Sequence, residues 1–291
     1  MVDQEQLAEQ FEEHRSHLRT VAYRMLGSVA EADDAVQEAW LRLARTDVSD
    51  VVNLRGWLTT VVSRVCLDAL RSRKARREES LEVHVPDPVV TRLDADPATA
   101  AERADEVTLA MLVVLDALNP RERMAFVLHD MFGVPFDTIG EIVDTTPANA
   151  TQLASRARRR VRSTPPPVAD LATQRRVLDA FTSAAERGDF DALVAVLDPD
   201  VTLRADAGSS GASTVIRGAI KVASQATAFR RSNLTQVHLP VLVNGAVGLL
   251  ALRDGRPFSV FSPVIREGRI VEINIVADPA RLTSIDLHSL V

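Results

Sequence analysis

The side chains of this sequence best suited to binding chemistry are arginines crowded at the end of one predicted helix. Five arginines occupy the seven positions from Arg156 to Arg162, and no acidic residue stands among them. Planar guanidinium groups make paired hydrogen bonds to phosphates and to guanine edges, and amide side chains pair with adenine. Asn149 and Gln152 place such amides on the same face of the helix. We therefore expect this face to contact duplex DNA; a solvated basic helix end that meets its own dipole is the alternative.

The elements that must position this face have the pattern of a helix-turn-helix. Apolar residues recur at helical spacing on the opposite side, at Ala150, Leu153, Ala154, Ala157 and Val161. Thr146 and Pro147 are typical of a helix start, and a short helix through Ile139 and Val143 precedes them. A short helix, a tight turn and a second helix with polar groups outward predict insertion into the major groove.

Two further helices near the N-terminus carry opposite charges. Ser28 and Glu31 form a capping box for a helix that buries a stripe from Ala32 to Leu43. Its outward face carries Asp33, Asp34, Gln37 and Glu38. A second helix, residues 54–77, ends in a run of basic residues. The spacing predicts a compact helical domain with one acidic and one basic helix.

Composition restricts the class of protein. The chain has 291 residues, 46% of them hydrophobic, and a formal net charge of −6, values typical of a globular protein with two or three domains. The apolar run at 241–252 is too short to cross a bilayer, and the acidic N-terminus lacks a signal-peptide pattern, so we expect a cytoplasmic protein. The single cysteine, Cys66, lies in an apolar stripe and predicts no disulfide, and no metal or cofactor is expected.

Changes in composition divide the chain into five parts. Residues 1–77 and 105–163 are predicted helical domains, and an acidic, proline-containing linker at 78–104 separates them. A proline hinge at 164–169 precedes the last domain, residues 170–291. That domain begins with helices at 170–187 and 190–197. Strands follow near 201–206, 235–243, 246–253, 257–266 and 269–277.

Three hairpin markers join the last four strands of the third domain. They are Asn244-Gly245, Asp254-Gly255 and Glu267-Gly268, pairs that favour tight turns. The pattern predicts an α+β domain with a curved antiparallel sheet, helices packed on one face and a cavity between them.

Three segments together resemble extracytoplasmic-function (ECF) RNA polymerase sigma factors over about residues 5–163. They are "SVAEADDAVQEAWLRLAR", "LRGWLTTVVSRVCLDALRSRKARR" and "LNPRERMAFVLHDMFGVPFDTIGEIVDTTPANATQLASRARRRVR". They correspond to regions two and four, the latter with its helix-turn-helix. The third domain resembles the SnoaL-like or NTF2-like cone domain of the SigJ-type subgroup, supported by "VPDP" at Val85–Pro88 and "ADPARL" at Ala277–Leu282.

The resemblance implies a promoter-specificity subunit that initiates transcription, has no catalytic activity and binds core RNA polymerase and promoter DNA. The β′ clamp helices would bind Asp33, Asp34, Gln37 and Glu38, and region four would meet the β flap. The linker would thread into polymerase channels built for nucleic acid. The melted downstream promoter element would meet Arg55, Ser63, Arg64, Asp68 and Arg71. The upstream element would meet base-reading Asn149, Gln152 and Arg156 and phosphate-binding Arg158, Arg159 and Arg160.

The resemblance also implies a regulatory role for the third domain, which could hold a small-molecule ligand of unknown identity. The residues concerned are Pro86, Asp87, Pro88, Asp206, Asp278, Pro279, Arg281 and Leu282. Two departures from the subgroup stand out. "DAGSSG", Asp206–Gly211, matches the subgroup's glycine-rich element only loosely, and His84 replaces an aromatic residue before the linker motif.

Two other functions stay open at this point. An enzyme would use Asp206 and His238 as an acid-base pair in the cavity of the third domain. A ligand-responsive repressor would bind DNA through residues 135–162, but it leaves residues 5–77 without a role.

Overall fold

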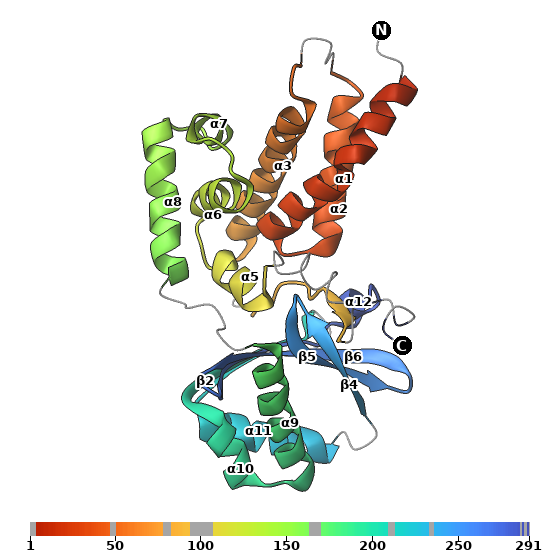
Figure 1. Ribbon diagram of the computed structural model, residues 1–291, viewed down its shortest axis with the longest axis vertical. Helices are drawn as coiled ribbons and strands as arrows, with labels where there is room; N and C mark the ends of the chain where they lie inside the picture. The colour runs from red at the N-terminus through yellow and green to blue at the C-terminus, as the bar shows by residue number, and fades with distance from the viewer. Residues whose placement is uncertain are drawn as a thin grey trace. The chain divides into compact units, whose positions relative to one another are not determined.

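The computed structural model describes residues 4–46, 51–77, 83–93, 107–162, 170–208, 213–232 and 236–285, together with Leu287 and Leu290. They form two compact units (Figure 1). The first contains the described parts of 1–81 and 112–164, and the second those of 82–111 and 165–291. Among these residues, no helix is long and apolar enough to cross a membrane.

The first unit begins with three long helices, α1 (Gln4–Leu26), α2 (Val29–Leu43) and α3 (Leu54–Arg77). Gly27 ends α1 with a positive φ of 68°. Ser28 then caps α2 by accepting a hydrogen bond from the Glu31 amide at 3.4 Å. The three helices bury one shared core, which contains Phe11, Leu18, Met25, Leu43 and Leu58.

The same unit holds the second helical group. It comprises α6 (Pro120–Phe126), the π-helical turn η1 (Val127–Met131), α7 (Phe136–Ile142) and α8 (Pro147–Arg162). Helix α5 (Leu109–Asp116) precedes them, and its residues from Leu112 onward belong to this unit. Asn119 caps α6, and the Thr146 hydroxyl accepts from the Asn149 amide at 3.3 Å at the start of α8. The helix that begins at Pro120 widens into the π turn after Phe126.

The two helical groups pack directly against each other within the first unit. Arg123 is 1% exposed, and its guanidinium donates to Asp116 at 3.1 Å and to the backbone carbonyl of Arg24 at 3.4 Å. Phe132 packs edge-on against His17, with 5.5 Å between the ring centroids. Arg71 of α3 lies 3.5 Å from Asp144, in the turn before α8. The two groups are therefore joined by both buried and exposed contacts.

The second unit is built on a seven-stranded sheet with the order β1-β4-β5-β6-β7-β2-β3. The strands are β1 (Val90–Arg92), β2 (Leu197–Asp206), β3 (Thr214–Arg217), β4 (Val237–Val243), β5 (Ala246–Arg253), β6 (Arg256–Arg266) and β7 (Arg269–Val276). All three expected hairpin turns occur, with both turn residues at positive φ. The sheet is mixed rather than wholly antiparallel, because β2 pairs with β7 in parallel.

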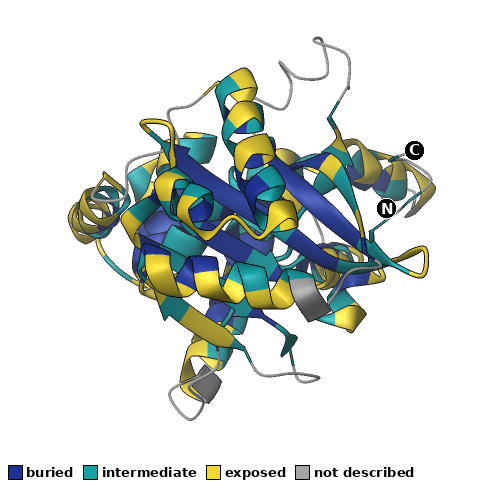
Figure 2. Ribbon diagram, turned by 90° about the horizontal axis from the view of Figure 1, so that it is seen from below, coloured by how far each residue is buried: buried dark blue, intermediate teal, exposed yellow. Residues whose placement is uncertain are grey.

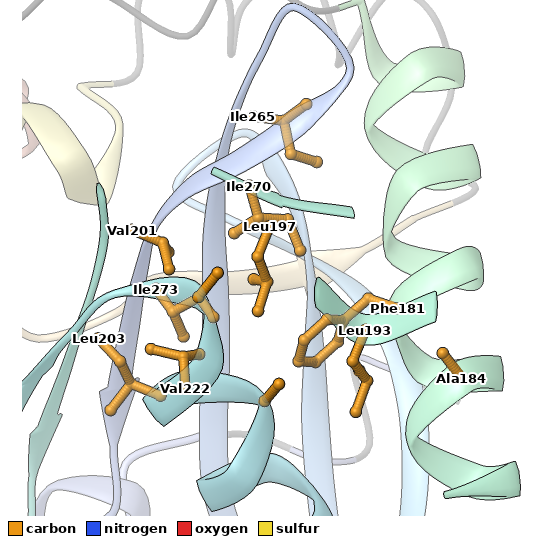
Figure 3. Packing of buried hydrophobic residues seen from close by; sticks show 12 residues of the cluster. Phe181, Ala184, Leu193, Leu197, Val201, Leu203, Val222, Ile265, Ile270 and Ile273 are labelled. Carbon is orange, nitrogen blue, oxygen red and sulfur yellow. The ribbon is translucent and has the colours of Figure 1, made fainter. Parts of the chain in front are cut away.

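Three helices cover one face of this sheet (Figure 1): α9 (Leu171–Arg187), α10 (Phe190–Val196) and α11 (Ala219–Ser232). Their inward side chains meet those of β2, β6 and β7 in one apolar core, which contains Phe181, Leu193, Val222, Ile265 and Ile273 (Figure 3). The sheet strands are largely buried, whereas the outward sides of the helices are exposed (Figure 2). A short helix, α12 (Pro279–Leu282), follows the last strand.

The segment expected to be an extended linker contributes to the second unit. Residues 90–92 form β1 and pair antiparallel with 241–243 of β4. Just before β1, Val89 and Asn244 exchange backbone and side-chain hydrogen bonds of 2.8 and 3.0 Å. Val85 is fully buried although acidic and proline residues surround it in the sequence. Residues 83–93 are therefore a structural part of the C-terminal domain.

Candidate promoter and polymerase surfaces and the linker clasp

Helix α8 presents the arginine face predicted for duplex DNA. Asn149, Gln152, Arg156 and Arg159 are exposed on it, while Ala150, Ala154 and Ala157 are buried beneath. Two other arginines are held by acidic partners: Arg158 lies 2.6 Å from Asp130, and Arg160 lies 2.9 Å from Glu122. The face thus combines exposed side chains with arginines fixed against their own domain.

Helix α3 places most of its predicted DNA-contacting residues at the surface. Arg55, Arg64, Asp68 and Arg71 are exposed. Ser63 is 0% exposed, so its hydroxyl can reach DNA only if the packed helices around it separate. The resemblance to the sigma factors implied a DNA contact for Ser63, but this position is buried in the structure.

Helix α2 carries the acidic face. Asp33, Asp34 and Gln37 are exposed, and Glu38 is half-buried. Arg19 donates to Asp33 at 2.6 Å, and Arg42 donates to Glu38 at 2.9 Å, so both carboxylates have a fixed orientation. Asp34 and Gln37 complete an exposed polar surface between them.

A cluster in the second unit binds the linker to the C-terminal domain; we call Val85, Asp87, Asp206 and Arg281 the linker clasp. Asp206 is 3% exposed and accepts from the Val85 amide at 2.9 Å and from Arg281 at 2.8 Å. The same guanidinium pairs with Asp87 and donates to the Val85 carbonyl. One arginine therefore joins both chain segments.

The remaining predicted regulatory residues surround the clasp. Pro86 is buried, and Pro88 is half-buried. Asp278 caps α12 by accepting from the Ala280 amide at 2.9 Å, Pro279 is exposed at the first turn, and Leu282 is 1% exposed. The two sequence elements, nearly two hundred residues apart, are thus brought together. Residues 209–212 of the loosely matched glycine-rich element lie outside the described residues.

Comparison with known proteins agrees with this arrangement. The Sigma-70 region 2 family matches residues 10–76, and the Sigma-70, region 4 family matches residues 108–161. The chain is 39% identical to the ECF RNA polymerase sigma factor SigJ of Mycobacterium tuberculosis, over 94% of this chain and 92% of that protein. This chain belongs to the ECF sigma factors.

Other relatives extend the same match to the C-terminal domain. The probable ECF sigma factor SigI of Mycobacterium tuberculosis is 36% identical over 92% of both chains. The crystal structure of Mycobacterium tuberculosis SigJ covers 95% of this sigma factor and 98% of its own chain, with a TM-score of 0.73 and 36% identity. The fold is therefore the expected one, with helical regions two and four followed by an α+β NTF2-like domain. The protein is a sigma factor that directs RNA polymerase to promoters and initiates transcription.

The electrostatics of the sigma factor's clasp favour an ionised Asp206. Burial raises the pKa of this carboxyl. Hydrogen bonds from His84, the Val85 amide and the Gly208 amide lower it, as does the charge of Arg281. Together these lowering effects exceed the effect of burial, so the pKa lies below its ordinary value. His84, which departs from the subgroup pattern, lies 3.5 Å from this carboxylate. The clasp is thus a buried ion pair with additional hydrogen-bond donors.

The structure does not bring together the acid-base pair of the enzyme hypothesis. His238 lines a cavity in the C-terminal domain, whereas Asp206 is not among the residues that line it and is engaged in the clasp. In the described part of the chain, no group of three or more histidine, cysteine or acidic side chains could hold a metal ion. Cys66 is buried, and burial raises the pKa of its thiol to about 12, as expected for a structural residue.

Sequence reasoning missed three features that hold the linker on the C-terminal domain. It did not find strand β1, the burial of Val85, or the contacts of Asn244, whose side chain accepts from the Val89 amide and donates to the Val107 carbonyl just after the linker. The available indication was the pair of apolar residues at Val89 and Val90 after the prolines, a run too short to predict a strand.

Proposed function

We propose that the C-terminal domain regulates this sigma factor by retaining the linker. The observation that carries the proposal is the linker clasp, where buried Asp206 and Arg281 bind the backbone at Val85. Strand β1 adds backbone pairing to β4. Residues 83–93 held in this way are unable to enter a polymerase channel at the same time, so retention opposes engagement of the polymerase.

The surfaces of the helical domains receive separate roles in this proposal. The acidic face of α2 (Asp33, Asp34, Gln37 and Glu38) binds the β′ clamp helices, and region four meets the β flap. On α3, Arg55, Arg64, Asp68 and Arg71 contact the melted downstream element. On α8, Asn149, Gln152 and Arg156 read base edges, while Arg158, Arg159 and Arg160 meet phosphates. The exposure of all of these residues except Glu38 and Arg158, which are half-buried, supports the roles. We also propose that the protein acts in the cytoplasm and catalyses no reaction.

The same proposal explains an acidic protein with two basic helices. Positive charge lies on the two helices assigned to DNA, where it attracts phosphate. Negative charge on α2 meets a protein surface instead, where complementary charge sets orientation and association rate. The overall net charge of −6 is therefore compatible with DNA binding.

Run-off transcription tests the regulatory role directly. Purified bacterial core polymerase would be given DNA from upstream of the protein's own gene, with either the wild-type protein or the Arg281→Gln variant. We expect transcripts that depend on the added protein and more transcript from the variant, because its linker is released. Equal or lower transcript from a folded variant whose linker is shown to be released would mean that retention does not inhibit.

Reversing charge at Asp34 tests the polymerase surface. Asp34 is exposed, whereas Asp33 already pairs with Arg19, so Asp34→Lys changes the surface without breaking that ion pair. We expect association with core polymerase to slow about tenfold, since like charges would then meet. Surface plasmon resonance would measure the rate, with Asp200→Lys on the C-terminal domain as control. An equal effect from both substitutions would indicate only a change in net charge.

A further inference from the structure

The C-terminal domain encloses a cavity of about 320 Å³ between helices α9 and α11 and the sheet. This volume lies at the lower end of the roughly 300–1,000 Å³ typical of sites for small molecules. The residues that line it come from both helices and from six of the strands, so the cavity is formed by the domain's main scaffold. It is lined within one unit and is separate from the clasp.

The walls of this cavity are aromatic and apolar. Phe181 of α9 stacks with Phe261 of β6, with 5.6 Å between the ring centroids. Phe229 of α11 stacks with Phe258 of β6 at 6.4 Å. Phe229 is 42% exposed, which places it where the cavity meets solvent. Such walls favour a ligand with a flat or branched apolar body.

Three ionisable side chains also line the cavity: Arg230 on α11, Glu186 on α9 and His238 on β4. The Nη1 atom of Arg230 is buried and has no hydrogen-bond partner among the residues that the structure describes. Its Nη2 atom lies 3.9 Å from Glu186, whose side chain is 59% exposed. An exposed pair at that distance binds weakly, so Arg230 retains donor capacity inside the cavity.

The pKa of His238 is affected by the charges of Arg230 and Glu186 in the same region. Its pKa is lowered first by burial and then by the positive charge of Arg230, while Glu186 acts in the opposite direction. The guanidinium charge therefore outweighs the carboxylate at this position. A half-buried cation with one buried, unsatisfied donor atom is best compensated by an anion that accepts from it.

We propose that this cavity binds a small acid, with its apolar body between the two phenylalanine pairs and its anionic head on Arg230. Strand β2 links the cavity to the clasp, because Ala205 lines the cavity and the clasp residue Asp206 follows it. A role of this acid as the regulatory signal rests on the proposed function above, whereas binding of the acid does not depend on that function.

Binding of 2-naphthoate to the full-length protein tests the ligand class. Isothermal titration would compare this acid with the neutral amide of the same shape, 2-naphthamide. We expect the acid to bind at least tenfold more tightly to the wild-type protein. Arg230→Gln should weaken naphthoate binding about 10- to 100-fold and leave naphthamide binding nearly unchanged, because a hydrogen bond to a charged group is lost. Arg269→Gln, an exposed position outside the cavity, is the matched control.

Three outcomes would overturn the proposal: no binding of naphthoate at millimolar concentration, equal binding of acid and amide, or equal binding by the wild type and Arg230→Gln. If Arg230→Gln does not fold, Ala226→Phe fills the same cavity from α11 and should abolish binding of both probes. Retained binding in that variant would contradict the location. This experiment does not measure transcription. A failure to bind naphthoate would therefore not bear on linker retention, which run-off transcription tests separately.

Discussion

A protein carrying Arg281→Gln is expected to unfold its C-terminal unit about 3 kcal/mol more easily than the wild type. Arg281 is largely buried between Asp206 and Asp87, and removing one partner of a buried ion pair leaves an uncompensated charge that typically costs about 3–5 kcal/mol. The linker should also become accessible, because the same side chain binds the Val85 carbonyl. Urea unfolding followed by circular dichroism, together with trypsin cleavage after Arg92, measures both effects.

The matched control is Arg175→Gln on α9. Arg175 forms an exposed ion pair with Asp179 at 3.0 Å, and such pairs contribute less than about 1 kcal/mol. We expect this variant to unfold like the wild type and to keep Arg92 protected. A similar loss of stability in both variants would show that the buried clasp has no special energetic role.

Acid should weaken the clasp, because protonation of Asp206 removes the negative charge that pairs with Arg281. Its pKa in the folded protein lies below the ordinary value, so its contribution to stability is complete above about pH 4, the ordinary pKa of aspartate. That contribution is lost as the pH falls from there toward the folded-state pKa. Asp206→Asn should show a shallower loss over this range, measured by urea unfolding between pH 2 and 5. Parallel curves for the two proteins would contradict the assigned pKa.

Replacing Arg156 and Arg159 together by alanine should weaken promoter binding by about 3 kcal/mol, roughly a hundredfold. Both side chains are exposed on α8, whereas Arg158 and Arg160 pair with acidic residues of their own domain. The double variant should therefore remove DNA contacts without loss of fold. Fluorescence anisotropy with polymerase holoenzyme and promoter DNA measures the affinity.

The single variants separate reading of sequence from attraction to phosphate. Arg156→Ala should reduce the preference for the correct upstream element, whereas Arg159→Ala should weaken binding to all sequences and reduce the salt dependence by about one ion. Arg175→Ala with Arg187→Ala, one half-exposed and one exposed arginine of α9, removes the same charge elsewhere. If this control pair weakens binding equally, α8 does not form the DNA contact.

Local sequence signals predicted the helices and hairpins well. The helix at 54–77 has the expected bounds, and Ser28 caps the helix that it was expected to start. Asn244-Gly245 forms the tight turn that its residue types favour. These features depend on neighbours a few residues apart, so composition and spacing contain the needed information.

Features that depend on distant partners could not be read in this way. Strand β1 has three residues and pairs with a segment about 150 residues later, and the acidic composition around it favours an open linker. The parallel pairing of β2 with β7 is also non-local. For the candidate site, the family resemblance supplied Ser63 as a DNA-contacting residue, but it could not show that Ser63 is buried in this protein.

The pairing of β1 with β4 has a consequence for how this protein can be divided or recombined. In a fragment that begins at Asp170, β4 would become an open edge, because the backbone groups of Val241–Val243 would lose their partners in β1. Such edges are templates for aggregation. The part left behind would expose Val85 and Pro86 to water. The border that the order of the sequence suggests, before Asp170, therefore differs from the border of the folded domain. A C-terminal domain moved intact into another protein must include the linker.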